Sequence, residues 1–366
     1  MHITDLANEL LLHIFQSSND ISSLLALSST CKHFHSIFTS HRLPTLYQAA
    51  EAQYGPLSDA IRVVTHNESQ LAHIPRPAPP QSLALLKRLI EVGRVANQWV
   101  AVYPSQKWRG EDSASRRLLN GVECYKLRRA CYRMWLYTLA FHTSRHDCTT
   151  RLHPQAIRTR AMLIRPWPSD QLAEMLDLHA IFRQVLHSQI CPSNGTVLRR
   201  HRQRYPDDHL PLVITTGFAK ARDECAGFQQ GYFHSTPHVS RLSMAKSYGH
   251  RHGAVEGWGD EITQYYVVED MLKLDPGQLM HLFECVVGHV SPTTGVFVHH
   301  DHLRGSKGMV EQFVAGLGDW FENNGETLVE TVGAVVRDRG DSMTALQELV
   351  EDGCDGIATW GDGGTD

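Results

Sequence analysis

The chain has 366 residues, of which 42% are hydrophobic and 20% are charged, and its formal net charge is −4. These values are typical of a soluble globular chain that is large enough for one substantial core and a small additional module. The longest dense apolar run, 130–141, contains Arg133 and is too short for a bilayer, and no basic segment followed by an apolar one opens the chain, so we expect neither a membrane span nor a secretory signal.

The first predicted elements are three short helices within residues 6–38. Apolar residues recur there at helical spacing in three runs: Leu6, Leu10, Leu11, Ile14 and Phe15; Ile21, Leu24, Leu25 and Leu27; and Cys31, Phe34, Ile37 and Phe38. About forty residues cannot bury that much apolar surface among themselves. We therefore expect part of this surface to contact another protein or the rest of the chain.

The order of these residues resembles the F-box in its short fungal form. The resemblance is carried by Leu-Ala-Asn-Glu-Leu at 6–10, Ile14-Phe15, Ser-Leu-Leu-Ala-Leu at 23–27, Cys31-Lys32-His33-Phe34 and Ile37. It covers roughly the first 45 residues. The chain has Ala7 where the family usually has a proline, which would pre-set the first helical turn.

The F-box family is an all-helical module that binds the Skp adaptor, which in turn sits on a cullin–RING ubiquitin ligase. The resemblance therefore implies this adaptor as a partner. It also implies adaptor contacts from eight residues, except for those that pack inside the module: Leu6, Leu10, Ile14, Phe15, Leu24, Leu27, Phe34 and Ile37. The alternative is an ordinary N-terminal helical subdomain that packs on the rest of the chain.

The remaining chain is predicted to be helical with long loops, so the expected fold class is all-α. We expect the F-box module over 1–48, connecting helices over 49–73, a stiff proline-rich linker over 74–80, an irregular helical domain for substrate recognition over 81–352 and a disordered tail over 353–366. Apolar stripes predict long helices over 85–103 and 116–142, the second of them central to the core.

Capping residues and breakers predict several further helix ends. Ser169 is expected to cap one helix, and Asp260-Glu261 to start another that ends before Pro276. The run 262–272 also resembles a segment of fungal F-box proteins. Near the C-terminus we expect one helix over 310–321, stopped by Asn-Asn-Gly at 323–325, a second over 328–336 and a third over 343–350.

Charge is distributed unevenly along the chain. Residues 76–205 hold 22 Lys and Arg against 8 Asp and Glu, whereas residues 206–366 hold 10 against 25. We favour attraction between the two parts within one fold, over an acidic or phosphorylated partner and over nucleic acid, for which a basic segment alone is non-specific. The densest basic cluster is the candidate target-binding site: Arg199, Arg200, Arg202 and Arg204. The loop-rich stretch 206–259 beside it is a second candidate recognition surface.

Catalytic and metal-binding motifs are missing from the sequence. The eight cysteines form no Cys-x-x-Cys pair, which indicates reduced thiols in the cytosol or nucleus. The cluster His299-His300-Asp301-His302 lacks a metal-ligand spacing, and there is no Gly-rich phosphate loop or Gly-x-Ser-x-Gly elbow. We therefore expect no cofactor, no metal and no enzyme.

The sequence thus predicts a non-catalytic subunit of a Skp–cullin–F-box ubiquitin ligase. Such a subunit would hold an unknown target protein for ubiquitination by proximity and orientation. The alternative is a scaffold or trafficking partner that binds the Skp adaptor without a role in degradation.

Overall fold

The computed structural model describes residues 6–74, 76–108, 117–204, 257–287, 306–342, 344 and 346. Every regular element within these ranges is a helix, and no strand occurs in them, which confirms the predicted all-helical class. No helix among the same residues is long and apolar enough to cross a membrane. The predicted third C-terminal helix lies largely outside the described residues, as do the predicted tail, the His299–His302 cluster and most of 206–259.

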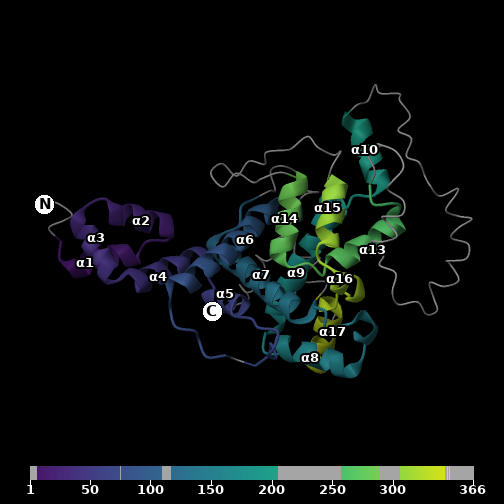
Figure 1. Cartoon of the computed structure of the whole chain (residues 1–366), viewed down its shortest axis with the longest axis horizontal. Helices are drawn as coiled ribbons and strands as arrows, with labels where there is room; N and C mark the ends of the chain where they lie inside the picture. The colour runs from purple at the N-terminus through teal and green to yellow at the C-terminus, as the bar shows by residue number, and fades with distance from the viewer. Residues whose placement is uncertain are drawn as a thin grey trace, which may run out of the picture.

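Three short helices form an N-terminal module at one end of the molecule (Figure 1): α1 (Asn8–Gln16), α2 (Ile21–Ser29) and α3 (Lys32–Ser40). Helix α2 begins where the Asp20 carboxylate accepts a hydrogen bond from the Ser23 amide at 2.7 Å. Hydrogen bonds from the Ser23 side chain and then from its amide lower the pKa of Asp20. Helix α3 begins with the Phe34 amide 3.5 Å from the Cys31 Sγ.

Helix α4 (Arg42–Tyr54) joins this module to the larger part of the protein, which we call the body. It packs on α1, α2 and α3 and, further along, on α5 (Leu57–Val64) and on α6 (Leu83–Lys107). Side chains of the body hold its C-terminal end: Tyr132 Oη donates to the Tyr54 carbonyl at 2.7 Å, and Arg128 Nε donates to the Gly55 carbonyl at 2.9 Å. The helix therefore runs uninterrupted through the boundary expected at residue 48.

The proline-rich segment 74–80 connects helices that are packed against each other. Helix α5 precedes this segment, and it packs on α6 and on α7 (Gly121–Phe141), which both follow the segment. Four residues of α5 are buried: Leu57, Ala60, Val63 and Val64. Residue 74 and residues 76–80 thus lie at the surface of the body, and the helices before and after them share one core.

Helices α6, α7 and α9 (Ser169–Val185) form the centre of the body, as their mutual contacts show. Trp99 of α6 is fully buried; its ring lies 4.4 Å from that of Phe182, and its Nε1 donates to the Pro276 carbonyl at 2.9 Å. Helix α7 opens with a capping box in which Asn120 and Glu123 bond each other's backbone amides. More than half of its residues are buried, as the apolar surroundings predicted from sequence require.

The C-terminal helices cover this centre, with α8 (Pro154–Ile164) against the last of them. They are α13 (Glu261–Met271), α14 (Pro276–Val287), α15 (Ser306–Ala315), α16 (Asp319–Asn323) and α17 (Leu328–Asp338). The predicted start of α13 is confirmed, because the Asp260 carboxylate accepts from the Thr263 amide at 2.8 Å. The predicted end before Pro276, which opens α14, is also confirmed.

Two local predictions were wrong. The single helix expected over 310–321 is two helices, because Gly318 has a φ of 82° and turns the chain between α15 and α16. Ser169 does not cap α9: Pro168 precedes the helix, and the Ser169 hydroxyl lies 2.9 Å from an Asp341 carboxylate oxygen.

A buried polar cluster ties the start of α17 to α7 and α8. The Tyr137 hydroxyl lies 2.9 Å from the Thr327 hydroxyl and 2.8 Å from the Thr331 hydroxyl. Arg160 Nε donates to the same Thr331 oxygen at 3.0 Å, and the Thr331 hydroxyl donates to the Thr327 carbonyl at 2.7 Å. These groups satisfy one another's hydrogen-bonding capacity inside the core, so specific polar contacts as well as apolar packing hold the start of α17 in place.

A carboxyl and an imidazole lie buried next to this cluster. Glu326 Oε1 is 3.7 Å from His179 Nε2, and their side chains are 9% and 5% exposed. Burial raises the pKa of Glu326 to about 7 and lowers the pKa of His179 to about 3. Near neutral pH the imidazole is therefore uncharged, and the carboxyl is at the midpoint of its titration.

Candidate functional site

The interior of the N-terminal module is aromatic. The Phe15 ring of α1 meets the Phe34 ring edge-on, with centroids 5.9 Å apart, and its centroid lies 6.0 Å from that of Phe38. Leu11, on the same face of α1 as Phe15, is also buried. Three nine-residue helices can enclose only this small core, and therefore some of their apolar residues must remain outside it.

Four of the eight predicted adaptor contacts belong to that interior. Phe15, Leu24, Phe34 and Ile37 are at most 9% exposed, and they pack on one another or on α4. In this structure their side chains shape the module from inside and present little surface to a partner. The sequence analysis had left this division open, because the same apolar stripe serves internal and external contacts.

The other four predicted contacts keep accessible surface. Leu10 is 54% exposed, and Leu6, Ile14 and Leu27 are partly buried against the core. Leu10 and Ile14 are four residues apart and so share one side of α1, whereas Leu6 precedes the helix. Leu25 of α2, which was not among the predicted contacts, is 45% exposed. Leu25 stands four residues after Ile21 in the same apolar run, so spacing alone gave no signal of its exposure.

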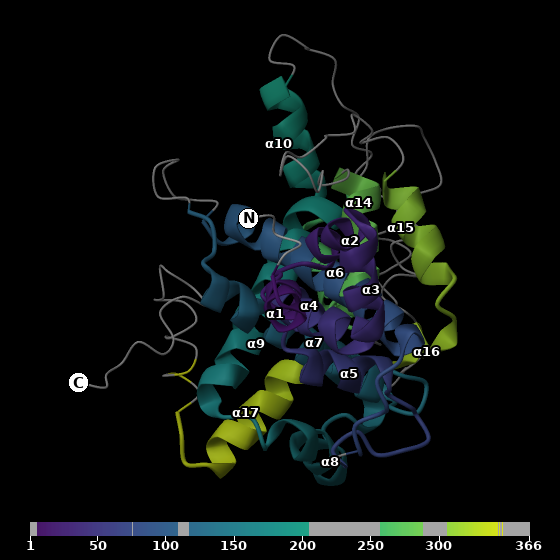
Figure 2. The same cartoon turned by 90° about the vertical axis from the view of Figure 1, so that its left-hand side faces the viewer.

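The arginine cluster lies on α10 (Asn194–Arg204), which projects from the body at the end away from the module (Figure 1). Seen along the long axis, the module faces the viewer and α10 stands out beyond the body (Figure 2). The helix follows α9 through a π-helical turn, η3 (Leu186–Ile190), and Ser193 Oγ accepts from the Thr196 amide at 3.2 Å at its start. Ser193 therefore caps α10.

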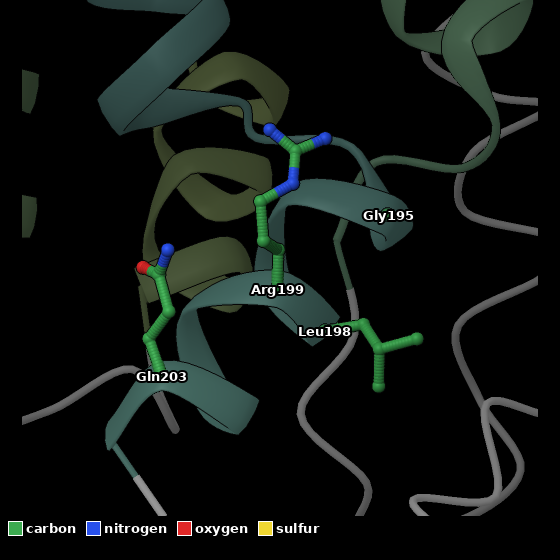
Figure 3. A pocket seen from close by; sticks show the side chains of 4 residues that line it. All are labelled: Gly195, Leu198, Arg199 and Gln203. Carbon is green, nitrogen blue, oxygen red and sulfur yellow. The ribbon is translucent and has the colours of Figure 1, made fainter. Parts of the chain in front are cut away.

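The described arginines of α10 have different surroundings. Arg199 is exposed, while Arg200 is half-buried and its guanidinium donates to the Ser188 carbonyl of η3. Figure 3 shows Arg199 and Gln203 extending from one side of the helix and Leu198 from another, around an open hollow of about 360 Å³. Arg202 and Arg204 lie on the last turn, and their side chains are outside the described part of the structure.

Helix α13 starts at the base of α10. The Asn194 amide donates to the Gly259 carbonyl at 2.9 Å, and the Trp258 amide donates to the Pro192 carbonyl at 2.8 Å. We call α10, α13 and the joint formed by 191–194 and 257–260 the α10–α13 crest. Both helices therefore start from one joint, which these hydrogen bonds hold together.

Ion pairs link the basic middle to the acidic C-terminal part at other positions. Arg151 lies 3.2 Å from Glu330, Arg165 lies 2.9 Å from Asp338, and Arg183 pairs with Glu269. These contacts come from α8, α9 and the turn before α8 rather than from α10. Intramolecular charge pairing therefore exists in the described residues, but Arg199 takes no part in the pairs found there.

The described residues contain no group of three or more His, Cys, Asp or Glu side chains that could hold a metal ion. The nearest approach to a reactive pair among them is Cys285 Sγ, 3.7 Å from His281 Nε2 on α14, and burial raises the pKa of this thiol. A raised pKa keeps the sulfur protonated and weakly nucleophilic.

Comparison with protein families gives one match. A model of the F-box-like family matches residues 3–43, which are α1, α2, α3 and the residues beside them. This match supports an F-box protein with an adaptor-binding role, generally within Skp–cullin–F-box complexes. Among curated proteins and among solved structures, none matches this chain.

Proposed function

We propose that this protein is the substrate-recognition subunit of a Skp–cullin–F-box ubiquitin ligase. The observation that carries the proposal is the F-box-like match over residues 3–43, in a module that exposes Leu10 and Leu25 at one end of the molecule. The module would bind the Skp adaptor, and the body would hold a target protein. Ubiquitin transfer would then follow from proximity, without a catalytic residue of this chain.

Two further observations fit this role. Helix α4 fixes the module to the body, so a target bound to the body would keep a defined position relative to the ligase. The cysteines in the described part of the chain are free, as expected for a protein of the cytosol or nucleus. The arginine cluster of α10 is the proposed place of target contact.

The test is co-purification of the Skp adaptor and the cullin with the full chain and with Leu10→Asp/Leu25→Asp. Both leucines are about half exposed, so the double variant should fold, yet a charged side chain at each position should abolish an apolar contact. The matched control is Leu71→Asp/Ile74→Asp, with 54% and 53% exposed side chains outside the module. We expect loss of both partners only in the first variant, with unchanged circular dichroism.

Undiminished recovery of the adaptor by Leu10→Asp/Leu25→Asp would contradict the adaptor contact. Recovery of the adaptor by the wild-type chain without any cullin would contradict the ligase role and leave a scaffold. The two results therefore separate the two parts of the proposal.

A further inference from the structure

The α10–α13 crest is held rigidly although α10 projects from the body. Besides the two backbone hydrogen bonds of the joint, the buried Gln264 amide of α13 donates to the carbonyls of His187 and Cys191 at 2.8 and 2.7 Å. A Cβ atom on Gly257 would lie 2.6 Å from backbone atoms of residues 192–194, so the two segments of the joint are in direct contact. Rigid support reduces the entropy that a surface loses when it binds a partner.

The π-helical turn η3 contributes to this support. Turns of this kind are rare and are frequent at functional sites. Here η3 supplies the His187 and Ser188 carbonyls that Gln264 and Arg200 bind. Arg200 of the cluster thus anchors α10, while Arg199, the preceding residue, stays exposed.

The charged residues of α10 are all basic. The segment 194–204 contains four arginines and His201 and no acidic residue. Three carboxylates of the C-terminal part, those of Glu330, Asp338 and Glu269, pair with Arg151, Arg165 and Arg183 instead. Arg199 is five residues along the helix, about 7.5 Å from its start, and no carboxylate of the described residues pairs with it.

The start of α13 carries two exposed apolar side chains beside the exposed Glu261. Ile262 is 69% exposed and Tyr265, three residues later on the same side of the helix, is 53% exposed. Both lie within two helical turns of the joint. An exposed aliphatic side chain next to an exposed tyrosine and a positive helix is a combination enriched at protein interfaces.

We propose that the α10–α13 crest binds an acidic segment of a partner protein that also carries an aliphatic or aromatic side chain. Carboxylates of the segment accept hydrogen bonds from Arg199 and its neighbours on α10, and the apolar side chain packs on Ile262 and Tyr265. The inference rests on the proposed function, since the partner is then the target held by the body. The charge of α10 selects this occupant over a basic or neutral one.

The test measures binding of a fluorescent peptide to the full chain by anisotropy at low and high salt. The probe is a twelve-residue peptide of glutamate with two leucines, and its control has glutamine at every glutamate. We expect the wild-type chain to bind the acidic probe more weakly at high salt than at low salt, and not to bind the glutamine control. Arg199→Glu should weaken binding at least about fivefold, as loss of a charge-assisted hydrogen bond predicts.

Matched variants separate the crest from general surface effects. Ile262→Ser should weaken binding about threefold or more, whereas Val122→Ser should not; Val122 is 64% exposed and is likewise the second residue of its helix. Arg94→Glu, at an exposed position of α6, is the charge control. The same variants are tested for Skp adaptor recovery, which should stay at the wild-type level throughout.

Equal binding of the acidic and glutamine probes, or full affinity in Arg199→Glu, would overturn the inference. So would binding that appears only after removal of residues 347–366, which contain six acidic residues and no basic one. That result would make the chain's own C-terminal segment the occupant. If the wild-type chain failed to recover the Skp adaptor, that result would contradict the proposed function and not this inference.

Discussion

At the scale of single residues, Glu326 is a buried carboxyl whose charged form the fold disfavours. It is buried beside the neutral His179 and the Tyr137 cluster, and its pKa is raised from 4.5 to about 7. The folded protein therefore holds the carboxyl proton more tightly than the unfolded chain does. The stabilisation that results is present below pH 4.5 and is lost as the pH rises to about 7.

This predicts a pH-dependent gain in stability for Glu326→Gln. Each pH unit between the two pKa values corresponds to about 1.4 kcal/mol, so the difference in unfolding free energy between the variant and the wild type should grow by about 2 kcal/mol from pH 5 to pH 8. Urea unfolding at several pH values measures this difference. Comparing the two proteins cancels the opposing contributions of His179 and His142, whose pKa values burial lowers to about 3.

The control is Glu91→Gln, which removes one carboxylate from an exposed position of α6. It should show no such growth with pH. A Glu326→Gln variant whose stability follows that of the wild type from pH 5 to pH 8 would mean that Glu326 titrates as it does in the unfolded chain.

At the scale of elements, α6 approaches the end of α4 closely at Gly93. A Cβ atom on Gly93 would lie 2.6 Å from Cγ and Cδ1 of the Tyr54 ring, and both residues are buried. The contact is with the ring atoms nearest the backbone, which cannot move without moving α4. Glycine at 93 therefore sets how closely the two helices approach.

Gly93→Ala should consequently destabilise the protein although alanine is the better helix former. The gain in helix propensity is about 1 kcal/mol, whereas overpacking a close contact costs about 1–3 kcal/mol. We expect a lower melting temperature than that of the wild type. Gly195→Ala, where the nearest atom to the new Cβ lies 3.9 Å away, should show no loss. A melting temperature for Gly93→Ala at or above the wild-type value would show that α4 and α6 can separate freely.

The same scale shows what the sequence predicts well. Periodic stripes located α6, α7 and α17, and the capping residue Asp260 located the start of α13, because both signals are local. The break at Gly318 was missed because its neighbours Leu317 and Trp320 continue the stripe of α15. The F-box-like order of 6–38 identified the module, but the burial of Phe15 and Leu24 and the exposure of Leu25 depend on how three helices pack, which spacing alone does not fix.

At the scale of the whole molecule, the position of α4 and α5 decides what folds as a unit. Both helices precede the proline-rich segment in sequence and pack with α6, while α5 also packs with α7, which follows it. The domain limits expected from sequence, with a linker at 74–80, place them outside the helical domain. The two descriptions make different predictions for truncated chains.

We predict that residues 76–366 alone will not unfold cooperatively, whereas residues 42–366 will. Removing α4 and α5 exposes the faces of α6 and α7 that bury Leu57, Ala60, Val63 and Val64, and leaves the guanidinium of Arg128 without the Gly55 carbonyl. Scanning calorimetry of both fragments and of the full chain measures this. A cooperative transition of 76–366 at the melting temperature of the full chain would instead make the proline-rich segment the domain boundary.

The continuity of α4 also limits how the length of this chain can change. A residue inserted into an α-helix rotates everything beyond it by about 100° and shifts it by about 1.5 Å. One insertion between Leu46 and Tyr54 would therefore turn the side of the module that exposes Leu10 away from its present direction relative to the α10–α13 crest. An insertion of the same size in 66–74 would leave that direction unchanged, so we expect natural length variation to be tolerated in that loop and excluded from α4.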